Sequence, residues 1–204
     1  MTRPSPEVVL VDYGMSNLRN VARSFERAGA KPVISRDPDE VRRADRLAVP
    51  GVGALGDAMR ALEARGLGDP LRERIPDGRP FLGICIGLQI LLERGEEGPT
   101  DGLALCPGQV ERFPERPGLP VPHMGWNRVR VMRPHPVLRE GHFYFVHAYR
   151  AQRVPPDWEL ARTDYGEEFP SALGREACLA VQFHPEKSQR EGLRLIERFC
   201  AWQP

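Results

Sequence analysis

A short apolar run that leads into a cysteine flanked by glycines constrains this chain most. Phe81-Leu82 is followed directly by Gly83-Ile84-Cys85-Ile86-Gly87, and helical periodicity continues through Glu93. A buried strand that turns sharply into a helix needs glycine at the turn and exposes the residue at its tip as a nucleophile. A thiol at the tip predicts thioester chemistry, with Cys85 as nucleophile and the N–H of Ile86 as an oxyanion donor. The alternative is a buried structural cysteine.

The first two-thirds of the chain predict an α/β fold. Continuous apolar runs, typical of strands buried on both faces, alternate with amphipathic segments. The expected strands are Val8–Val11, Pro32–Ser35, Arg46–Val49 and Phe81–Ile84, and the expected helices begin at Leu18 and cover Asp39–Arg43, Asp57–Arg65 and Pro70–Arg74. Ser16 or Asn17 can cap the first helix and Gly29 can end it. We therefore expect a doubly wound, mainly parallel sheet of the flavodoxin-like type, with helices on both faces.

The pattern changes near Leu103, where Pro and Gly begin to separate short segments. Strands are expected, several of them antiparallel, at Val129–Met132, His142–Tyr149, Trp158–Thr163 and Leu179–Phe183. A final helix is expected over Gln189–Trp202. No linker, repeat or low-complexity tract divides the sequence, so we expect residues 1–204 to form a single domain.

Composition excludes several classes of function. The formal net charge is only +1 among 204 residues, which gives no electrostatic reason to expect nucleic-acid binding. No segment approaches the roughly 20 apolar residues of a membrane helix, and the N-terminus lacks the apolar core of a signal peptide. The four cysteines include no C-x-x-C pair, which argues against a disulfide framework or a zinc knuckle. We expect a cytoplasmic protein that does not bind a membrane.

A second motif, His184-Pro185-Glu186, follows the apolar run Leu179–Phe183. A histidine at a strand end can act as general base, and a carboxylate two residues later can hold its tautomer. Alone, this motif is equally well a loop histidine beside a solvated glutamate. Together with Cys85 it predicts a Cys85–His184–Glu186 triad.

The segment Pro50-Gly51-Val52-Gly53 also follows an expected strand. Its glycines allow backbone N–H groups to turn towards a ligand, so Gly51, Val52 and Gly53 are candidates for a second oxyanion donor. An ordinary strand-to-loop turn would explain the glycines as well. A dinucleotide loop is not indicated, because a third glycine and the helix register are missing.

The remaining histidines show no metal-ligand spacing. His142 and His147 would point to opposite faces of a strand and could not easily share an ion. We therefore predict neither a metal nor a cofactor. The other cysteines, Cys106, Cys178 and Cys200, are most simply core residues.

These motifs resemble the class I (triad) glutamine amidotransferases, and most closely the glutaminase subunits of imidazole glycerol phosphate synthases. The matching segments run in order over nearly the whole chain: Asp12–Leu18, Pro50–Gly53, Gly83–Gln89, Pro122–Asn127, Tyr144–Tyr149 and His184–Gln189. The elbow and H-P-E are shared by many amidotransferases, whereas H-M-G-W-N and Y-G-x-x-N-L distinguish the synthase subunits.

The resemblance implies that Cys85 attacks the side-chain amide of glutamine while His184 transfers protons and Glu186 orients it. It also implies that Gln89, Glu97 and the segment His147-Ala148-Tyr149 bind glutamine. Ammonia would pass to a (βα)₈-barrel synthase partner in a 1:1 heterodimer. That partner would make imidazole glycerol phosphate and an aminoimidazole-carboxamide ribonucleotide in histidine biosynthesis.

Asn17, Trp126, Asn127 and Lys187 are candidates for the surface that faces this partner. Core packing is an equal alternative for Trp126. Lys187 is one of only two lysines in an arginine-rich chain, the other being Lys31, which suggests a specific contact.

The chain departs from the family pattern at two positions. Ser16 replaces the usual glycine, and Ala148 replaces a common serine. If residue 148 binds glutamine through its backbone, we expect a mild effect, and if a hydroxyl is required, weaker binding.

Three other interpretations remain. Glutaminases of anthranilate, purine or pyridoxal phosphate synthesis share the elbow but not the Pro122–Asn127 segment. A cysteine peptidase or hydrolase of one related group has histidine directly after the nucleophile, where this chain has Ile86. A catalytically silent binding module would not need Cys85, His184 and Glu186 together.

Overall fold

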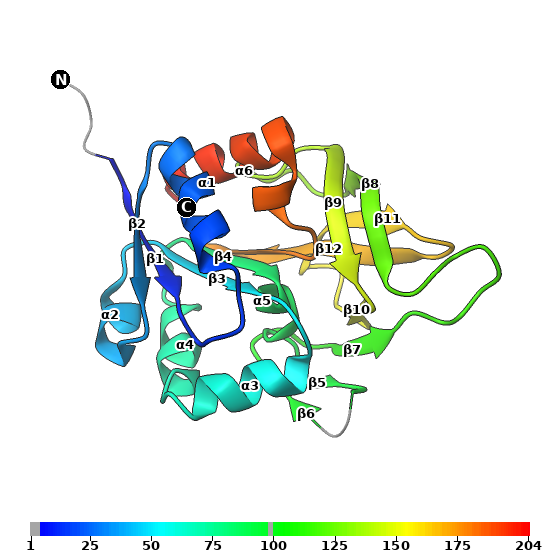
Figure 1. The fold of residues 1–204 in the computed structure, drawn as a ribbon, viewed down its shortest axis with the longest axis horizontal. Helices are drawn as coiled ribbons and strands as arrows, with labels where there is room; N and C mark the ends of the chain where they lie inside the picture. The colour runs from blue at the N-terminus through cyan, green and yellow to red at the C-terminus, as the bar shows by residue number, and fades with distance from the viewer. Residues whose placement is uncertain (1–4, 98–99) are drawn as a thin grey trace.

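The computed structural model describes residues 5–97 and 100–204, and a large mixed sheet dominates this part of the chain (Figure 1). Nine described strands lie in the order β2 (Lys31–Ser35), β1 (Glu7–Val11), β3 (Leu47–Gly51), β4 (Phe81–Cys85), β13 (Cys178–Val181), β12 (Glu168–Arg175), β11 (Glu159–Asp164), β8 (His123–Val131) and β9 (Gly141–His147). The strands from β2 to β13 are parallel, and those from β12 to β9 pair antiparallel. This order is flavodoxin-like, as predicted.

Helices cover both faces of the parallel part. On one face lie α1 (Leu18–Arg27) and α6 (Gln189–Ala201), and on the other lie α2 (Pro38–Arg43), α3 (Leu55–Glu63), α4 (Gly68–Arg74) and α5 (Ile86–Gln89) (Figure 1). The alternation of side chains along β1 creates the two cores. Val8 and Leu10 belong to the core that contains Phe25 of α1, whereas Val9 and Val11 belong to the core that contains Leu62 of α3.

A second, four-stranded sheet packs beside the first. Its described strands are ordered β10 (Tyr149–Gln152), β7 (Gln109–Arg112), β5 (Arg94–Gly95) and β6 (Thr100–Asp101). The predicted single strand His142–Tyr149 is therefore wrong, because the chain leaves β9 and the large sheet at Ala148 and enters the small sheet at Tyr149. The backbone at Ala148 forms the corner, where its carbonyl accepts a hydrogen bond from Phe113 N at 2.9 Å.

The helix after Cys85 is much shorter than predicted. It ends at Gln89 rather than at Glu93. The carbonyls of the next four residues accept hydrogen bonds from the loop at 102–106, for example Leu103 N to Ile90 O at 2.7 Å and Gly102 N to Glu93 O at 2.9 Å. Carbonyls bound by a distant loop do not serve the next helical turn, so α5 stops after one turn.

The strand predicted at Val129–Met132 is wrong at its start, because β8 begins at His123 and pairs with β9 from there to Val129. The remaining boundaries agree within a few residues. Asn17, not Ser16, caps α1, with its side chain accepting a hydrogen bond from Asn20 N. Gly29 follows the helix with a φ of +80°. The strand β12, buried in the sheet, was not predicted, and neither were β5, β6 and β7.

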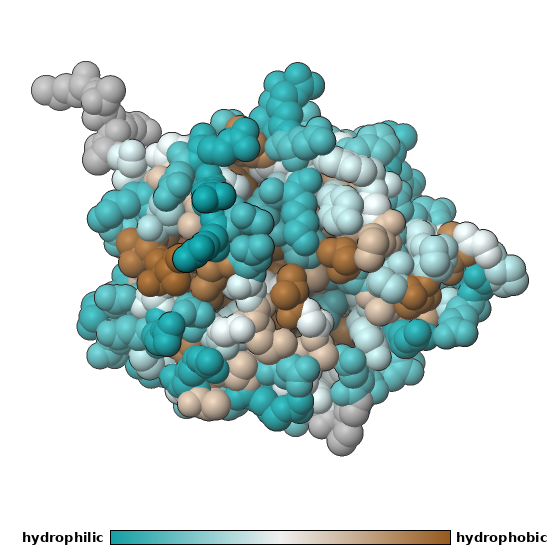
Figure 2. All heavy atoms as spheres, viewed as in Figure 1, coloured by the Kyte–Doolittle hydropathy of each residue, from teal (hydrophilic) through white to brown (hydrophobic). Residues whose placement is uncertain are grey.

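Polar side chains cover most of the surface seen in Figure 2, and apolar residues form separate patches among them. No helix in the described ranges 5–97 and 100–204 is long and apolar enough to cross a membrane.

Candidate active site

Cys85 lies at a strained turn between β4 and α5. It has a φ of 55° and a ψ of −102°, a region that non-glycine residues rarely adopt. Such a conformation costs about 1–3 kcal/mol and persists only where the surrounding structure imposes it. The thiol is held at the carboxyl end of the parallel strands, where open α/β sheets bind their ligands.

The flanking glycines allow the turn to pack closely. A Cβ at Gly83 would lie 2.3 Å from the carbonyl oxygen of Gly87, and a Cβ at Gly87 would lie 1.9 Å from the carbonyl oxygen of Val49. Both contacts involve backbone atoms that cannot move aside. The G-x-C-x-G pattern therefore reflects the close approach of α5 to β3 and β4.

His184 leaves the end of β13, the strand next to β4, and so lies near Cys85. Its Nδ1 lies 2.8 Å from Oε1 of Glu186, and both side chains are almost fully buried. Because the carboxylate accepts, Nδ1 carries a proton and Nε2 is left to exchange a proton with a neighbour. Backbone bonds fix the residue as well: His184 N donates to Tyr144 O at 2.9 Å.

The electrostatic surroundings favour a charged His184. Burial by itself would lower its pKa, but the Cys85 sulfur and the Glu186 carboxylate outweigh burial and raise the pKa to about 10. No hydrogen bond of Nε2 with ordinary distance and angle is found among the described residues, so this nitrogen remains available to exchange a proton. An imidazolium here offers the sulfur a positive partner.

The predicted oxyanion strand is present, but one of its donors is engaged elsewhere. Val52 N donates to the carbonyl of Met15 at 2.9 Å. At Gly51, a Cβ would lie 1.9 Å from the hydroxyl of Tyr13 and 2.8 Å from Cβ of Ile86, so the strand packs tightly against α5. Gly53 has a φ of +102°, which a larger residue would adopt only under strain. The N–H of Ile86 begins α5 beside the thiol.

Of the residues predicted to bind glutamine, Gln89 and His147 are buried and Glu97 is exposed. Gln89 is buried and donates through Nε2 to the carbonyl of Tyr149 at 3.1 Å, which joins α5 to the 147–149 corner. Glu97 is exposed and contacts the Tyr149 side chain, whose pKa is raised by burial and by that carboxylate. His147 is buried behind this corner.

Three of the four residues predicted to face a partner, Trp126, Asn127 and Lys187, lie on or beside the strand pair β8–β9. Trp126 is 48% exposed, which rules out the core alternative, and its ring meets Tyr144 edge-on at 6.2 Å. The Nζ of Lys187 lies 6.0 Å from the centre of the Tyr144 ring. Asn127 is half-buried one residue further along β8, and Asn17 is exposed at the start of α1.

Sequence reasoning missed Gln182. This side chain is fully buried, and its Nε2 lies 3.6 Å from the sulfur of Cys85. Its position two residues before His184 could have indicated it, because alternate residues of an extended segment face the same side. Tyr144, which contacts Trp126 and Lys187, was also not singled out.

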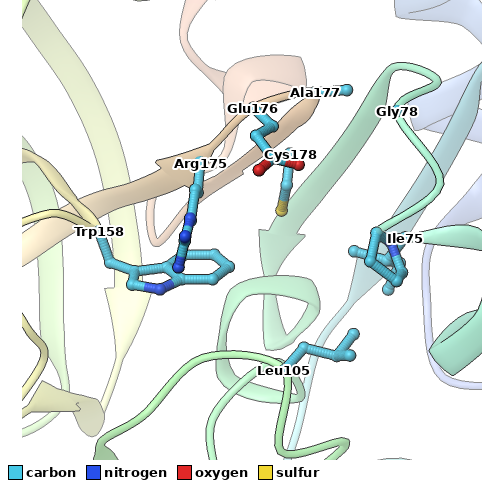
Figure 3. Close-up of a pocket in the computed structure, with 9 residues that line it drawn as sticks. Ile75, Gly78, Leu105, Trp158, Arg175, Glu176, Ala177 and Cys178 are labelled. Atoms are coloured by element: carbon cyan, nitrogen blue, oxygen red, sulfur yellow. The ribbon is translucent and has the colours of Figure 1, made fainter.

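A separate cavity of about 220 Å³ lies at the opposite edge of the sheet (Figure 3). Its lining includes Trp158, Arg175 and Cys178, whose sulfur points into it. Cys178 begins β13 and pairs with Phe81 at the start of β4, whereas Cys85 ends β4. The cavity is therefore distant from the predicted triad. Burial raises the pKa of the Cys178 thiol, in keeping with a structural cysteine.

The other two cysteines, Cys106 and Cys200, are buried too, as predicted. Among the described residues, no three His, Cys, Asp or Glu side chains are grouped as metal ligands would be. The arrangement around Cys85 thus offers a nucleophile, a proton carrier with its orienting carboxylate, and backbone donors. This set can form and hydrolyse a thioester.

Comparison with known proteins agrees with this chemistry. The family described as glutamine amidotransferase class-I matches residues 9–202. A solved structure entitled a glutamine amidotransferase superposes with a TM-score of 0.74 at 24% identity and covers 94% of this chain and 96% of that one, which supports the fold. The chain belongs to the class I glutamine amidotransferase family.

Curated relatives narrow the family further. The imidazole glycerol phosphate synthase subunit HisH of Symbiobacterium thermophilum is 47% identical over 93% of this chain and 91% of its own length. The subunit of the same name from Syntrophotalea carbinolica is 46% identical over 94% of this chain and 98% of its own. Within the class I amidotransferases, the chain belongs with these HisH subunits, which confirms the predicted resemblance.

Proposed function

We propose that this chain hydrolyses glutamine and delivers the ammonia to a (βα)₈-barrel synthase partner. The partner would use it to form imidazole glycerol phosphate and an aminoimidazole-carboxamide ribonucleotide in histidine biosynthesis. The observation that carries the proposal is the strained Cys85 elbow beside the buried His184–Glu186 pair, in a chain that aligns with HisH subunits over most of its length. Four free cysteines suit a reducing cytoplasm.

The chemistry proceeds in two steps. The sulfur of Cys85 attacks the side-chain carbonyl of glutamine, and the C–N bond breaks as His184 gives a proton to the leaving nitrogen. Ammonia departs and leaves a γ-glutamyl thioester. Water then attacks the thioester with His184 as base, which releases glutamate and restores the thiol.

The oxyanion that forms in each step needs backbone donors. Ile86 N–H is one candidate, and Val52 N–H is the other. Because Val52 N–H donates to Met15 O, we propose that the isolated chain is in a low-activity state. Loss of one oxyanion donor lowers a rate by about 10²–10³. Docking of the partner against the loop at 12–17 would release this bond and turn the peptide towards the thioester.

The departure at Ala148 fits a backbone role for this residue. Its carbonyl is already bound at the corner, and the neighbouring amides remain the groups that can contact glutamine. We therefore expect Ala148 to leave glutamine affinity little changed. Nothing in the structure explains Ser16, whose buried hydroxyl has no partner among the described residues.

Glutamate release measured with the chain alone, with the barrel partner, and with partner plus its nucleotide ligand tests the function. We expect slow turnover alone and a rise of about 10²-fold or more in the full complex. Cys85→Ala should abolish glutamate release in all three. Equal turnover in the three conditions would contradict the gating, and activity that survives Cys85→Ala would contradict the nucleophile assignment.

The same assay separates the competing functions. Activation by a partner from anthranilate or purine synthesis, but not by the histidine-pathway barrel, would support another amidotransferase. Peptide or ester hydrolysis without glutaminase activity would support a cysteine hydrolase. A chain that binds the barrel but releases no glutamate in any condition would be a silent binding module.

A further inference from the structure

The Gln182 side chain bridges the nucleophile and the corner at Tyr149. Its Oε1 accepts a hydrogen bond from Gln89 Nε2 at 3.1 Å, so its amide nitrogen is the group that faces Cys85, 3.6 Å from the sulfur. The second hydrogen of Gln89 Nε2 goes to the carbonyl of Tyr149 at 3.1 Å. Two amide side chains thus link the sulfur to this carbonyl.

A pair of buried histidines continues from the same carbonyl. His147 Nδ1 lies 2.8 Å from the Tyr149 oxygen, and since a carbonyl only accepts, Nδ1 carries the proton. Burial lowers the pKa of His147 to about 3, so its Nε2 is an unprotonated acceptor. His123 Nδ1, 3.2 Å from that Nε2, must then be the donor.

The chain of donors ends at Asn127 on β8. Burial also lowers the pKa of His123, to about 4, so with Nδ1 protonated its Nε2 accepts. Asn127 Nδ2 lies 3.2 Å from this Nε2 and donates its other hydrogen to Asp164 O at 2.8 Å. Asn127 Oδ1 accepts from Arg128 N at 2.7 Å, which fixes the orientation of the amide.

The aromatic surroundings hold the histidine rings in place. His123 is stacked between Tyr165, with ring centroids 4.0 Å apart, and Phe145, at 4.7 Å. His123 is 2% exposed and His147 is 6% exposed, so water cannot readily replace their partners. In such surroundings an unpartnered donor or acceptor is costly, and this favours one direction for every bond.

We propose that Gln182, His147 and His123 are positioning residues of a hydrogen-bond network with two arms that meet at Tyr149 O. In one arm Asn127, His123 and His147 donate in turn towards this carbonyl. In the other, Gln89 donates both to the carbonyl and to Gln182, which donates to the sulfur of Cys85. This proposal rests on the proposed glutaminase function. The network gives the Cys85 sulfur an N–H donor and holds Gln89 and the Tyr149 carbonyl in the orientation needed to bind glutamine. The orientation of the Asn127 amide, next to the exposed Trp126, therefore affects the position of the Tyr149 carbonyl and of Gln89.

Exchanging the positions of the amide oxygen and nitrogen of Asn127 would change the protonated nitrogen of both histidines. An oxygen facing His123 Nε2 would require a proton there and leave Nδ1 bare. His147 would then have to donate from Nε2, which would place its bare Nδ1 against the Tyr149 carbonyl. Two acceptors repel, so the corner and the Gln89 amide would lose their fixed position.

Nitrogen NMR of histidine in Asn127→Asp tests the direction of the chain. In the wild type we expect His147 and His123 to be neutral with the proton on Nδ1. The Asn127→Asp variant should move both protons to Nε2, whereas Asn20→Asp, the same change on exposed α1, should not. Wild-type protons on Nε2, or no change in Asn127→Asp, would overturn the proposal. This measurement does not depend on the glutaminase activity.

Alkylation of Cys85 by iodoacetamide tests the other end. Gln182→Met keeps the volume but removes the N–H donor, and we expect the alkylation rate to fall about tenfold, the effect of losing one hydrogen bond to the sulfur. Gln152→Glu, on β10, serves as the control and should react at the wild-type rate. Cys85→Ala gives the background of the other cysteines. An unchanged rate in Gln182→Met would overturn the role of Gln182.

Kinetics in the complex with the barrel partner distinguish positioning from collapse of the fold. Asn127→Asp should raise the KM for glutamine about tenfold or more, whereas Gln182→Met should mainly lower kcat. If both variants show wild-type kinetics in an active complex, the hydrogen-bond network proposal is overturned while the proposed glutaminase function stands. A wild-type complex that releases no glutamate would instead contradict the proposed function.

Discussion

At the scale of single residues, the candidate site depends on groups held in states they would not adopt alone. Cys85 has a positive φ, His184 is buried yet favoured as a cation, and Val52 N–H is bound to a neighbouring loop. The three residues lie at the ends of three different strands, and residues from the adjacent strands and loops impose these states. The chemistry therefore depends on the convergence of β3, β4 and β13 at one edge.

Glu186→Gln should narrow the pH range of activity from the alkaline side. The carboxylate favours the imidazolium and helps to raise the His184 pKa to about 10, so its removal lowers that pKa. If His184 must be protonated to serve the leaving nitrogen, activity is lost as the pH rises through this pKa. We expect the alkaline limb of kcat/KM to move down by about 1–3 pH units. An unmoved limb, judged against the control Glu191→Gln on α6, would contradict this assignment.

At the scale of elements, a buried arginine holds the loops at the edge opposite to the site. Arg74, at the end of α4, is 1% exposed, and its guanidinium donates to the carbonyls of Ala44, Asp45, Arg79 and Pro80. It also pairs with Asp77 at 2.9 Å. Burial lowers the pKa of Arg74 to about 10. These bonds join α2, α4 and the start of β4.

Arg74→Met should destabilise the protein by about 2–3 kcal/mol, because the bonds of a buried guanidinium to four carbonyls and Asp77 are lost, while Ala44 O and Asp77 keep a donor in Arg79 and Pro80 O keeps Leu47 N. Chemical denaturation gives the free energy of unfolding directly. Arg72→Met on the same helix removes only surface ion pairs with Glu63 and Asp69 and should cost less than about 1 kcal/mol. Equal losses in the two variants would show that burial of the guanidinium has no special weight.

At the scale of the whole molecule, the predicted catalytic residues and the buried Arg74 cluster lie at opposite edges of the doubly wound sheet. The carboxyl ends of the parallel strands carry the predicted triad and the oxyanion strand. The antiparallel pair β8–β9 adds Trp126 and Tyr144 beside them. The cavity at Cys178 and the Arg74 cluster lie at the opposite edge. A partner that binds the edge near Trp126 would therefore cover the site without disturbing either core.

Trp126→Ala should weaken binding of the barrel partner by about 2 kcal/mol or more, as expected for an exposed aromatic anchor. Because the side chain is 48% exposed, the free energy of unfolding should change by less than about 0.5 kcal/mol. Met132→Ala, in the residue that follows the end of β8 and 55% exposed, is the matched control. Calorimetric titration that finds equal affinity for both variants would exclude Trp126 from the interface.

The sequence by itself was enough for the sheet type, most of its strands and the family. Local signals carry that information: apolar runs for buried strands, glycines around Cys85, and residues such as His184 and Glu186 two positions apart. Their roles in catalysis stay predictions, although the structure brings them together as expected.

Only the tertiary structure decided the rest, because it depends on partners distant in the sequence. The helix after Cys85 ends early since a loop at 102–106 takes its carbonyls, and the expected strand at His142–Tyr149 divides because two sheets meet at Ala148. The engagement of Val52 N–H and the bond from Gln182 to Cys85 have the same origin. Local pattern placed the nucleophile on its turn, and long-range hydrogen bonding determined what surrounds it.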